Sequence, residues 1–181
     1  MIRLLSERKA LDRLKKLKSD LRTEVTGKYE HRAKSCLTCE TQGACCLDAH
    51  FVNVHISRLE AAAIRQTLSR LSEQKQLELN GRIDAAISKY SLTNEDDTYA
   101  QTFACPLFEK GIGCLVHEQG KPVACITHAC YDNKADLPPA ELQAEHERLV
   151  DDLNTRTYGR PQPWLPLPIA LAAEKKNRSG R

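Results

Sequence analysis

The residues of this chain whose type and spacing can do chemistry are its cysteines, which lie in two short windows. In the first window, Cys36 and Cys39 are separated by two residues, a spacing that lets the backbone curl around one metal ion and present two sulfurs to it. Cys45 and Cys46 follow directly on each other. Adjacent side chains usually diverge, so this pair suits two sites, or two atoms of one cluster, better than one tetrahedral zinc ion.

The second window places four further cysteines among glycines and prolines. Gly111 and Gly113 precede Cys114 and suit tight turns that bring backbone N–H groups toward metal-bound sulfur. Pro106 and Pro122 stiffen the loops. The candidate metal ligands of the whole chain are therefore Cys36, Cys39, Cys45, Cys46, Cys105, Cys114, Cys125 and Cys130.

An even number of cysteines would also suit disulfides, which persist mainly in secreted proteins. Charged residues interrupt the leucines of the amino terminus, which lacks the apolar core and cleavage site of a signal peptide. We therefore expect a cytoplasmic protein whose cysteines hold a metal or do redox chemistry. No apolar run approaches the roughly 20 residues of a membrane span, so we expect no membrane association.

Taken in order, the motifs resemble the YkgJ-like cysteine-cluster family, described as zinc- or iron-chelating. That family combines a Cys-x-x-Cys, a Cys-Cys, a short strand, a Ser/Thr-x-x-Glu helix start, a Cys-Pro-x-Leu, a glycine-flanked Cys and an Arg-Pro-x-x-Cys. The resemblance covers residues 36–130, although Lys121 replaces the arginine and Leu107 stands one place early. It rests on Cys36, Cys39, Cys45, Cys46, Ser57, Glu60, Cys105, Pro106, Leu107, Cys114, Lys121, Pro122 and Cys125.

The resemblance implies metal or cluster binding, and eight thiolates leave the metal open. They can hold one [4Fe-4S] cluster plus a zinc ion, two zinc ions, or one cluster with four spare cysteines. The adjacent cysteines and the lack of a second Cys-x-x-Cys favour an iron–sulfur cluster. Zinc has its own argument, because His117 and His128 each follow a cysteine by three residues. We favour reading both histidines as surface or packing residues.

Three functions remain in competition. In the first, an iron–sulfur or zinc centre serves structure, electron transfer or sensing, with another protein as partner. In the second, the cluster belongs to a protein-modifying enzyme, because the motif is similar to that of flagellin lysine N-methylases, where it accompanies an iron–sulfur cluster. The chain is shorter than those enzymes, and no catalytic base can be named. In the third, zinc builds a scaffold and a basic arm binds nucleic acid.

The basic arm is visible in the charge distribution. Residues 1–35 carry 11 Lys or Arg against 5 Asp or Glu, while residues 36–173 carry 12 against 18. Residues 174–181 are again basic, with four against one. We favour a solvated helix face over a nucleic-acid site, because acidic residues interrupt the arm.

The elements that position the cysteines are mostly helical. Apolar spacing predicts a helix over residues 2–25 ended by Gly27, and an alternating run predicts a strand over 51–55. Ser57 and Glu60 form a capping box that begins a helix extending to about Leu71. A second helix is expected over 73–90, with Leu77, Leu79, Ile83, Ala86 and Ile87 as its apolar stripe and a break permitted at Gly81.

The remaining segments complete a three-part organisation. Residues 94–98 are expected to form a loop, and Pro138 and Pro139 announce a helix that Gly159 closes. The prolines of residues 161–169 predict an extended strap. We expect a mostly α fold with a short β element, organised around a cysteine-ligated metal centre. Its parts are a basic helical arm (1–35), a cysteine-cluster domain (36–158), and a proline-rich strap with a basic tail (159–181).

Overall fold

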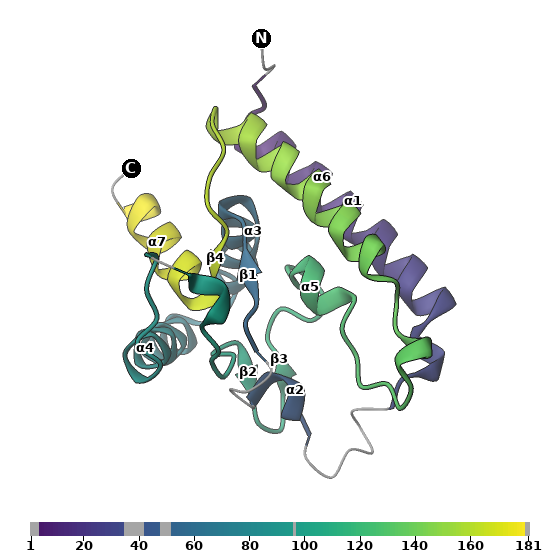
Figure 1. Cartoon of the computed structure of the whole chain (residues 1–181). Helices are drawn as coiled ribbons and strands as arrows, with labels where there is room; N and C mark the ends of the chain where they lie inside the picture. Colours follow the sequence, from purple (N-terminus) through teal and green to yellow (C-terminus); the bar gives the residue numbers. More distant parts are fainter. Residues whose placement is uncertain (1–3, 35–41, 48–51, 96, 180–181) are drawn as a thin grey trace. The chain divides into compact units, whose positions relative to one another are not determined.

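The chain is mostly helical, as its sequence predicts (Figure 1). This is a computed structural model, which describes residues 4–34, 42–47, 52–95 and 97–179. The chain divides into two interleaved compact units. Unit 1 comprises Met1–Gln42 and Lys121–Gln162, and unit 2 comprises Gly43–Gly120 and Pro163–Arg181. Within the described ranges, no helix combines the length and apolar character that a membrane crossing requires.

Unit 1 is built on two long helices, α1 (Glu7–Lys28) and α6 (Ala140–Tyr158), which lie side by side and run antiparallel (Figure 1). At one end, the backbone N–H of Leu5 donates to the carbonyl oxygen of Arg156 over 2.9 Å. At the other end, Arg32 is paired with Asp136 at 3.5 Å. These contacts fix the direction of the two helices within the unit.

Helix α1 presents one apolar face, with Ala10, Leu14, Leu21 and Val25 buried at helical spacing. The predicted helix is confirmed, but its predicted ends are wrong. The hydroxyl of Ser6 accepts the N–H of Lys9 and starts the helix later than expected. Gly27 does not end it, because the i to i−4 hydrogen bonds continue to the N–H of Tyr29, which donates to Val25.

Helix α6 ends as the sequence predicts, because Gly159 adopts a left-handed conformation with φ of 77°. Its first residue follows Pro139, whose carbonyl accepts the N–H of Leu142. Val150 and Leu153 are buried, whereas Leu142, His146 and Leu149 are only half-buried. Among the described residues, unit 1 also contains the short helices η1 (Glu30–Arg32), α5 (Val123–Ile126) and η4 (Lys134–Asp136).

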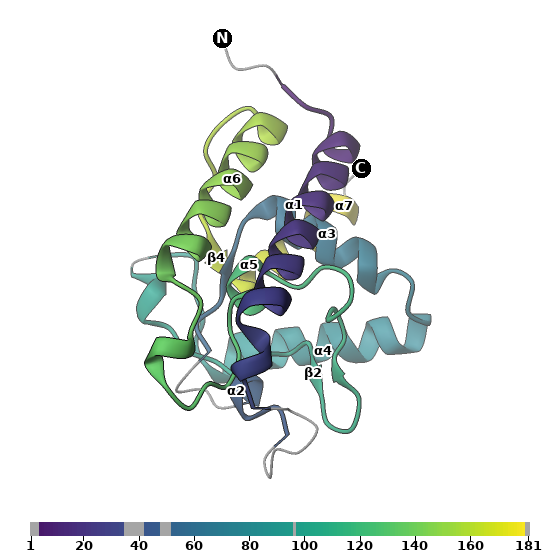
Figure 2. The same cartoon turned by 90° about the vertical axis from the view of Figure 1, so that its right-hand side faces the viewer.

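Unit 2 has a continuous hydrophobic core formed by α3 (Arg58–Leu68), α4 (Glu73–Lys89) and α7 (Leu167–Ser179) together with the intervening loops. Phe103 is the largest fully buried side chain among the residues of this unit that the structure describes. The turned view in Figure 2 shows α4 beside β2 (Phe108–Glu109), the first strand of a short hairpin. The core residues are Val52, Ile56, Ala61, Ile64, Leu68, Leu79, Ile83, Leu92, Phe103, Leu107, Val116, Leu167, Ala170 and Leu171.

The predicted capping box starts α3 as expected. The N–H of Glu60 donates to the Ser57 hydroxyl at 3.2 Å, and the Glu60 carboxylate accepts the N–H of Ser57 at 3.3 Å. Both side chains are fully buried, so these bonds satisfy polar groups that water cannot reach. The helix ends at Leu68, three residues before the predicted end.

Helix α4 confirms the second predicted helix. It passes through Gly81 without a break. Leu79, Ile83 and Ala86 are buried as predicted, but Leu77 is 74% exposed. The prediction for Leu77 is wrong because the helix packs on one side only, and Leu77 lies about 160° around the helix axis from Leu79.

The segment beyond α6 folds differently from the predicted strap. Leu165 and Pro166 form β4 (Leu165–Pro166), which pairs antiparallel with β1 (His55–Ile56). Helix α7 then starts at Leu167, so the prediction of an extended chain to Ile169 is wrong. Pro168 falls in the first turn, where its missing N–H costs no intrahelical bond.

Two further local predictions need adjustment. The predicted strand over 51–55 is displaced, because the described strand is His55–Ile56 and Phe51 lies outside the described residues. Val52 and Val54 still accept backbone bonds, from Phe103 and Leu167 respectively. The expected loop over 94–98 ends in a short helix, η3 (Thr98–Ala100).

Candidate metal centre

Each of the two cysteine windows is divided between the two units. By chain position, unit 1 contains Cys36 and Cys39 with Cys125 and Cys130, whereas unit 2 contains Cys45 and Cys46 with Cys105 and Cys114. Each unit therefore takes two cysteines from each window. Cys36 and Cys39 lie outside the described residues.

In unit 2, Cys45 and Cys46 lie on the short helix α2 (Ala44–Leu47), with their sulfurs 4.0 Å apart. The carbonyl of Gly43 accepts the N–H of Cys46 at 2.8 Å. Gly43 has a φ of 79°, and a Cβ at this position would overlap the ring of Phe108. Glycine is therefore required here for two reasons, namely its backbone conformation and the close approach of an aromatic ring.

Phe108 belongs to a hairpin that carries the other two cysteines of unit 2. Strand β2 (Phe108–Glu109) pairs with β3 (Gly113–Cys114), and Phe108 lies opposite Cys114. Cys105 precedes the hairpin, and its N–H donates to the carbonyl oxygen of Cys46 at 2.7 Å. Within unit 2, this backbone bond links the cysteines of the second window to those of the first window.

Cys105 has a strongly perturbed environment. Burial raises the pKa of its thiol to about 12, and the nearby Cys114 adds to the increase. Hydrogen bonds from the backbone N–H groups of Leu107 and Phe108, and the positive charge of Arg82, act in the opposite direction. Backbone N–H groups aimed at sulfur are the outer-shell partners that cysteine ligands of metal centres use.

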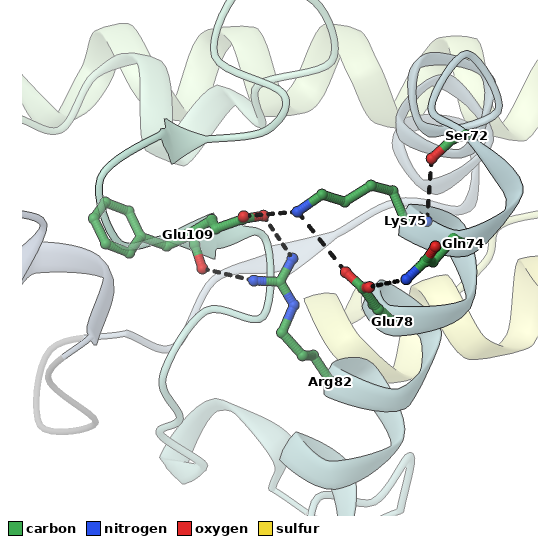
Figure 3. A network of polar contacts seen from close by, with 7 residues as sticks. Ser72, Gln74, Lys75, Glu78, Arg82 and Glu109 are labelled. Atoms are coloured by element: carbon green, nitrogen blue, oxygen red, sulfur yellow. Dashed lines mark hydrogen bonds and ion pairs between the residues drawn. The ribbon is translucent and has the colours of Figure 1, made fainter.

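An ion-pair network holds this hairpin on α4 (Figure 3). Glu109 accepts Lys75 at 2.8 Å and faces Arg82 at 3.7 Å. Arg82 also donates to the carbonyl oxygen of Phe108 at 3.2 Å. These contacts raise the pKa of Lys75 and lower that of Glu109, in both cases chiefly through their mutual hydrogen bond.

In unit 1, Cys125 lies on α5 and Cys130 lies in the segment that follows. The carbonyl oxygen of Cys130 accepts the N–H of Lys34 at 2.7 Å, and Ala33 forms a β-bridge with Tyr131. The segment that leads toward Cys36 in the sequence is thereby anchored beside Cys130. Both described cysteines of the unit are half-buried.

The two histidines considered for zinc binding are exposed. His117 follows β3, and its imidazole lies 3.8 Å from Glu118, its neighbour in sequence. His128 lies after α5 and is likewise exposed. Neither position supplies the buried, oriented imidazole of a structural zinc site.

Some of the basic side chains of helix α1 pair with acidic side chains of the same helix. Lys16 pairs with Asp20 at 2.9 Å, and Lys28 pairs with Glu24 at 2.8 Å. Lys18 is buried on the face that packs within unit 1. These contacts favour the interpretation of α1 as a packed helix with a solvated charged face.

The donor chemistry and the side-chain positions give different information about metal binding. Four thiols within one unit, two of them packed against its core, suit a soft metal ion or an iron–sulfur cluster. Among the described residues, however, no three His, Cys, Asp or Glu side chains converge as a ready ligand group.

Sequence reasoning missed three residues that build this region, namely Gly43, Arg82 and Phe108. Gly43 stands two residues before Cys45 and offered the one readable signal, a glycine at the start of a cysteine pair. Arg82 and Phe108 acquire their roles from contacts between distant segments, which no local pattern contains.

No protein-family model matches the chain, and no similar protein was found among the curated proteins or the solved structures.

Proposed function

We propose that this protein binds a metal through its cysteines, with an iron–sulfur cluster as the favoured centre, and uses it for structure, electron transfer or sensing. The observation that carries the proposal is the arrangement around Cys105. Its backbone is bonded to Cys46, its sulfur receives two N–H groups, and Cys114 lies close by. The resemblance of the cysteine motifs to the YkgJ-like family supports the same function.

In unit 2 the ligands would be Cys45, Cys46, Cys105 and Cys114. Unit 1 offers Cys125 and Cys130, with Cys36 and Cys39 as their partners by chain position. A bound cluster would supply one-electron chemistry, and a bound zinc ion would supply a structural cross-link. The chain itself contributes a partly buried site with N–H groups directed at sulfur.

Metal binding at Cys105 should depend on pH. Because burial raises the pKa of its thiol to about 12, the metal-free protein carries this residue protonated at neutral pH. A metal ligand must be a thiolate, so metal binding must release a proton. Affinity should therefore increase with pH.

Anaerobic purification with metal and acid-labile sulfide analysis tests the proposal. We expect brown protein containing iron and sulfide, with visible charge-transfer absorption that bleaches on reduction. Cys105→Ser should remove the unit 2 centre, while Cys125→Ser should affect only a centre in unit 1. Colourless protein containing zinc alone would identify the zinc scaffold instead, and protein without bound metal would contradict the proposal.

Chelation provides a second test that does not depend on colour. A site that is assembled only in the folded protein stabilises that state, so metal removal should lower the thermal unfolding temperature. Unchanged unfolding after complete metal removal would contradict a structural role.

A further inference from the structure

The charges of helix α1 are unevenly distributed along its length. Residues 8–16 carry five Lys or Arg against one Asp, whereas residues 19–28 carry two against two. The acidic residues that interrupt the helix therefore gather in its C-terminal half, and the expectation of a balanced, solvated face applies to that half. We call the five exposed cations of the N-terminal half the basic face, namely Arg8, Lys9, Arg13, Lys15 and Lys16.

The two halves of α1 also differ in how their charges are paired. In the C-terminal half, Lys28 pairs with Glu24 at 2.8 Å. At the boundary, Lys16 of the basic face pairs with Asp20 at 2.9 Å. The other four cations of the basic face form no ion pair within the part of the chain that the structure describes. Their charges are therefore available to an external anion.

Helix stability does not explain where these cations stand. Arg8 and Lys9 lie in the first turn of α1, where the positive end of the helix dipole disfavours cations. Glu7 is the acidic residue of this turn, and its carboxylate accepts the hydroxyl of Tyr158 at 3.2 Å. The side-chain charges and the helix dipole thus act together to attract anions to this end of α1.

Spacing arranges the basic face in two rows along the helix. Lys9, Arg13 and Lys16 follow one another at intervals of four and three residues, so they lie along one side of α1 at steps of about 6 and 4.5 Å. Arg8 and Lys15 are seven residues apart and form the second row. A regular series of cations matches an anion whose charges repeat, such as a nucleic-acid strand.

The surface of α1 also distinguishes nucleic acid from other anionic partners. This helix, whose residues are all described, exposes no large apolar side chain. Interfaces between proteins have apolar cores and are poor in lysine, whereas interfaces with DNA are strongly positive. Insertion into a membrane surface requires an apolar face, but that of α1 is buried within unit 1.

We infer that the basic face of α1 binds the phosphate backbone of nucleic acid. Contacts to phosphate position a protein on nucleic acid and carry no sequence information, so the binding is independent of sequence. This inference goes beyond the proposed metal function and does not depend on it.

Fluorescence anisotropy tests the inference, with the full chain as purified titrated into a labelled DNA duplex of about 20 base pairs. With about four phosphate contacts, binding should weaken roughly 100-fold when salt rises from about 50 to about 200 mM. Lys9→Gln/Arg13→Gln should weaken binding about tenfold at the lower salt and lower the slope of log affinity against log salt by about 2. Glutamine favours helices, so this variant should keep the helical circular dichroism of the wild type.

The matched control is Lys28→Gln/Lys34→Gln, which removes two exposed cations of the same unit. These lysines are already paired, with Glu24 and Asp132 respectively. Lys28 also lies about 18 Å along the helix from Lys16, beyond the screening length at these salt concentrations. We expect the affinity of the control to stay within about twofold of the wild type.

Asp12→Asn gives a test of opposite sign. Asp12 is exposed and lies between the two rows, so its removal should tighten binding by about two- to threefold, whereas damage to the helix would weaken binding. The inference fails if the wild type does not bind at the lower salt, if Lys9→Gln/Arg13→Gln binds like the control, or if Asp12→Asn binds more weakly. Polyglutamate that competes as well as unlabelled DNA of equal total charge would assign the face to acidic proteins and overturn the inference too.

Discussion

The two units hold their cysteines in contrasting ways. In unit 2, Cys105 and Cys114 pack against a core that α3, α4 and α7 build from apolar side chains. In unit 1, Cys125 lies on the four-residue helix α5, and Cys130 lies in a connecting segment. The long helices α1 and α6 provide the framework there, and they contribute no cysteine.

Because of this difference, a metal bound to cysteines would have a different role in each unit. Unit 2 has a continuous core of buried apolar side chains, so a metal would add to a unit that hydrophobic packing already holds together. In unit 1, a short helix and a β-bridge position the described cysteines. A metal would therefore contribute a larger share of the local stability in unit 1 than in unit 2.

The largest loss of stability is expected from a substitution in the core of unit 2. Phe103→Ala removes a fully buried ring and should lower the free energy of unfolding by about 3–5 kcal/mol. The single tryptophan of the chain, Trp164, belongs to unit 2, so its fluorescence in a denaturant titration reports this unit. Leu14→Ala in unit 1 should change the helical circular dichroism and leave the Trp164 midpoint in place. Coincident transitions in both variants would show that the cores are not separate.

A smaller loss of stability is expected when the contact between Gly43 and Phe108 is disturbed. Gly43→Ala should destabilise unit 2 by about 2–3 kcal/mol, because the new Cβ meets the Phe108 ring at a backbone angle that alanine disfavours. Gly111→Ala is the control, since Gly111 has a similar φ of 83° and open space around it. The difference between their denaturation midpoints isolates the steric contact. Equal midpoints would mean that α2 and the hairpin adjust freely.

The helix caps allow a finer comparison. Ser57→Ala should cost about 1–2 kcal/mol, because it leaves the buried N–H of Glu60 without its hydroxyl partner. Ser72→Ala, at the exposed cap of α4, should cost about 0.5–1 kcal/mol. Both shifts should appear in Trp164 fluorescence, whereas Ser6→Ala at the start of α1 should leave that signal unchanged. A larger cost at Ser72 than at Ser57 would contradict the importance of burial.

The smallest effect concerns the exposed pair of Lys75 and Glu109. The pKa of Glu109 is lowered, so its contribution is present above about pH 4.5 and is lost as the pH falls through the lowered value. The pKa of Lys75 is raised, so its contribution is lost only as the pH rises above about 10.5. The stability difference between the wild type and Lys75→Gln should therefore vanish once the pH is below the lowered pKa of Glu109, and also in high salt. A difference that persists at low pH would assign the effect of Lys75 to packing.

Local signals in the sequence identified local structure. The capping box of Ser57 and Glu60 located the start of α3, and Gly159 located the end of α6. Both depend on contacts between residues a few positions apart. Helix α7 was missed because the four prolines of residues 161–169 suggested an extended chain, although Pro168 falls in the one turn of a helix that tolerates it.

The candidate site shows the same division between local and distant information. Residue type and spacing identified all eight cysteines as the candidate ligands, and this prediction still awaits a test. Spacing could not reveal that the two windows are shared between two units, because that sorting depends on contacts such as the one between Cys105 and Cys46. For the same reason, Arg82 carried no sequence signal.

The interleaving of the units also determines how the chain must fold as it leaves the ribosome. Helix α1 emerges early, but its partner α6 is translated only after all of residues 43–120. Unit 2 likewise waits for α7 to complete its core. The apolar face of α1 is therefore without its native partner while residues 43–120 are translated, an interval in which exposed apolar surface invites chaperones or aggregation.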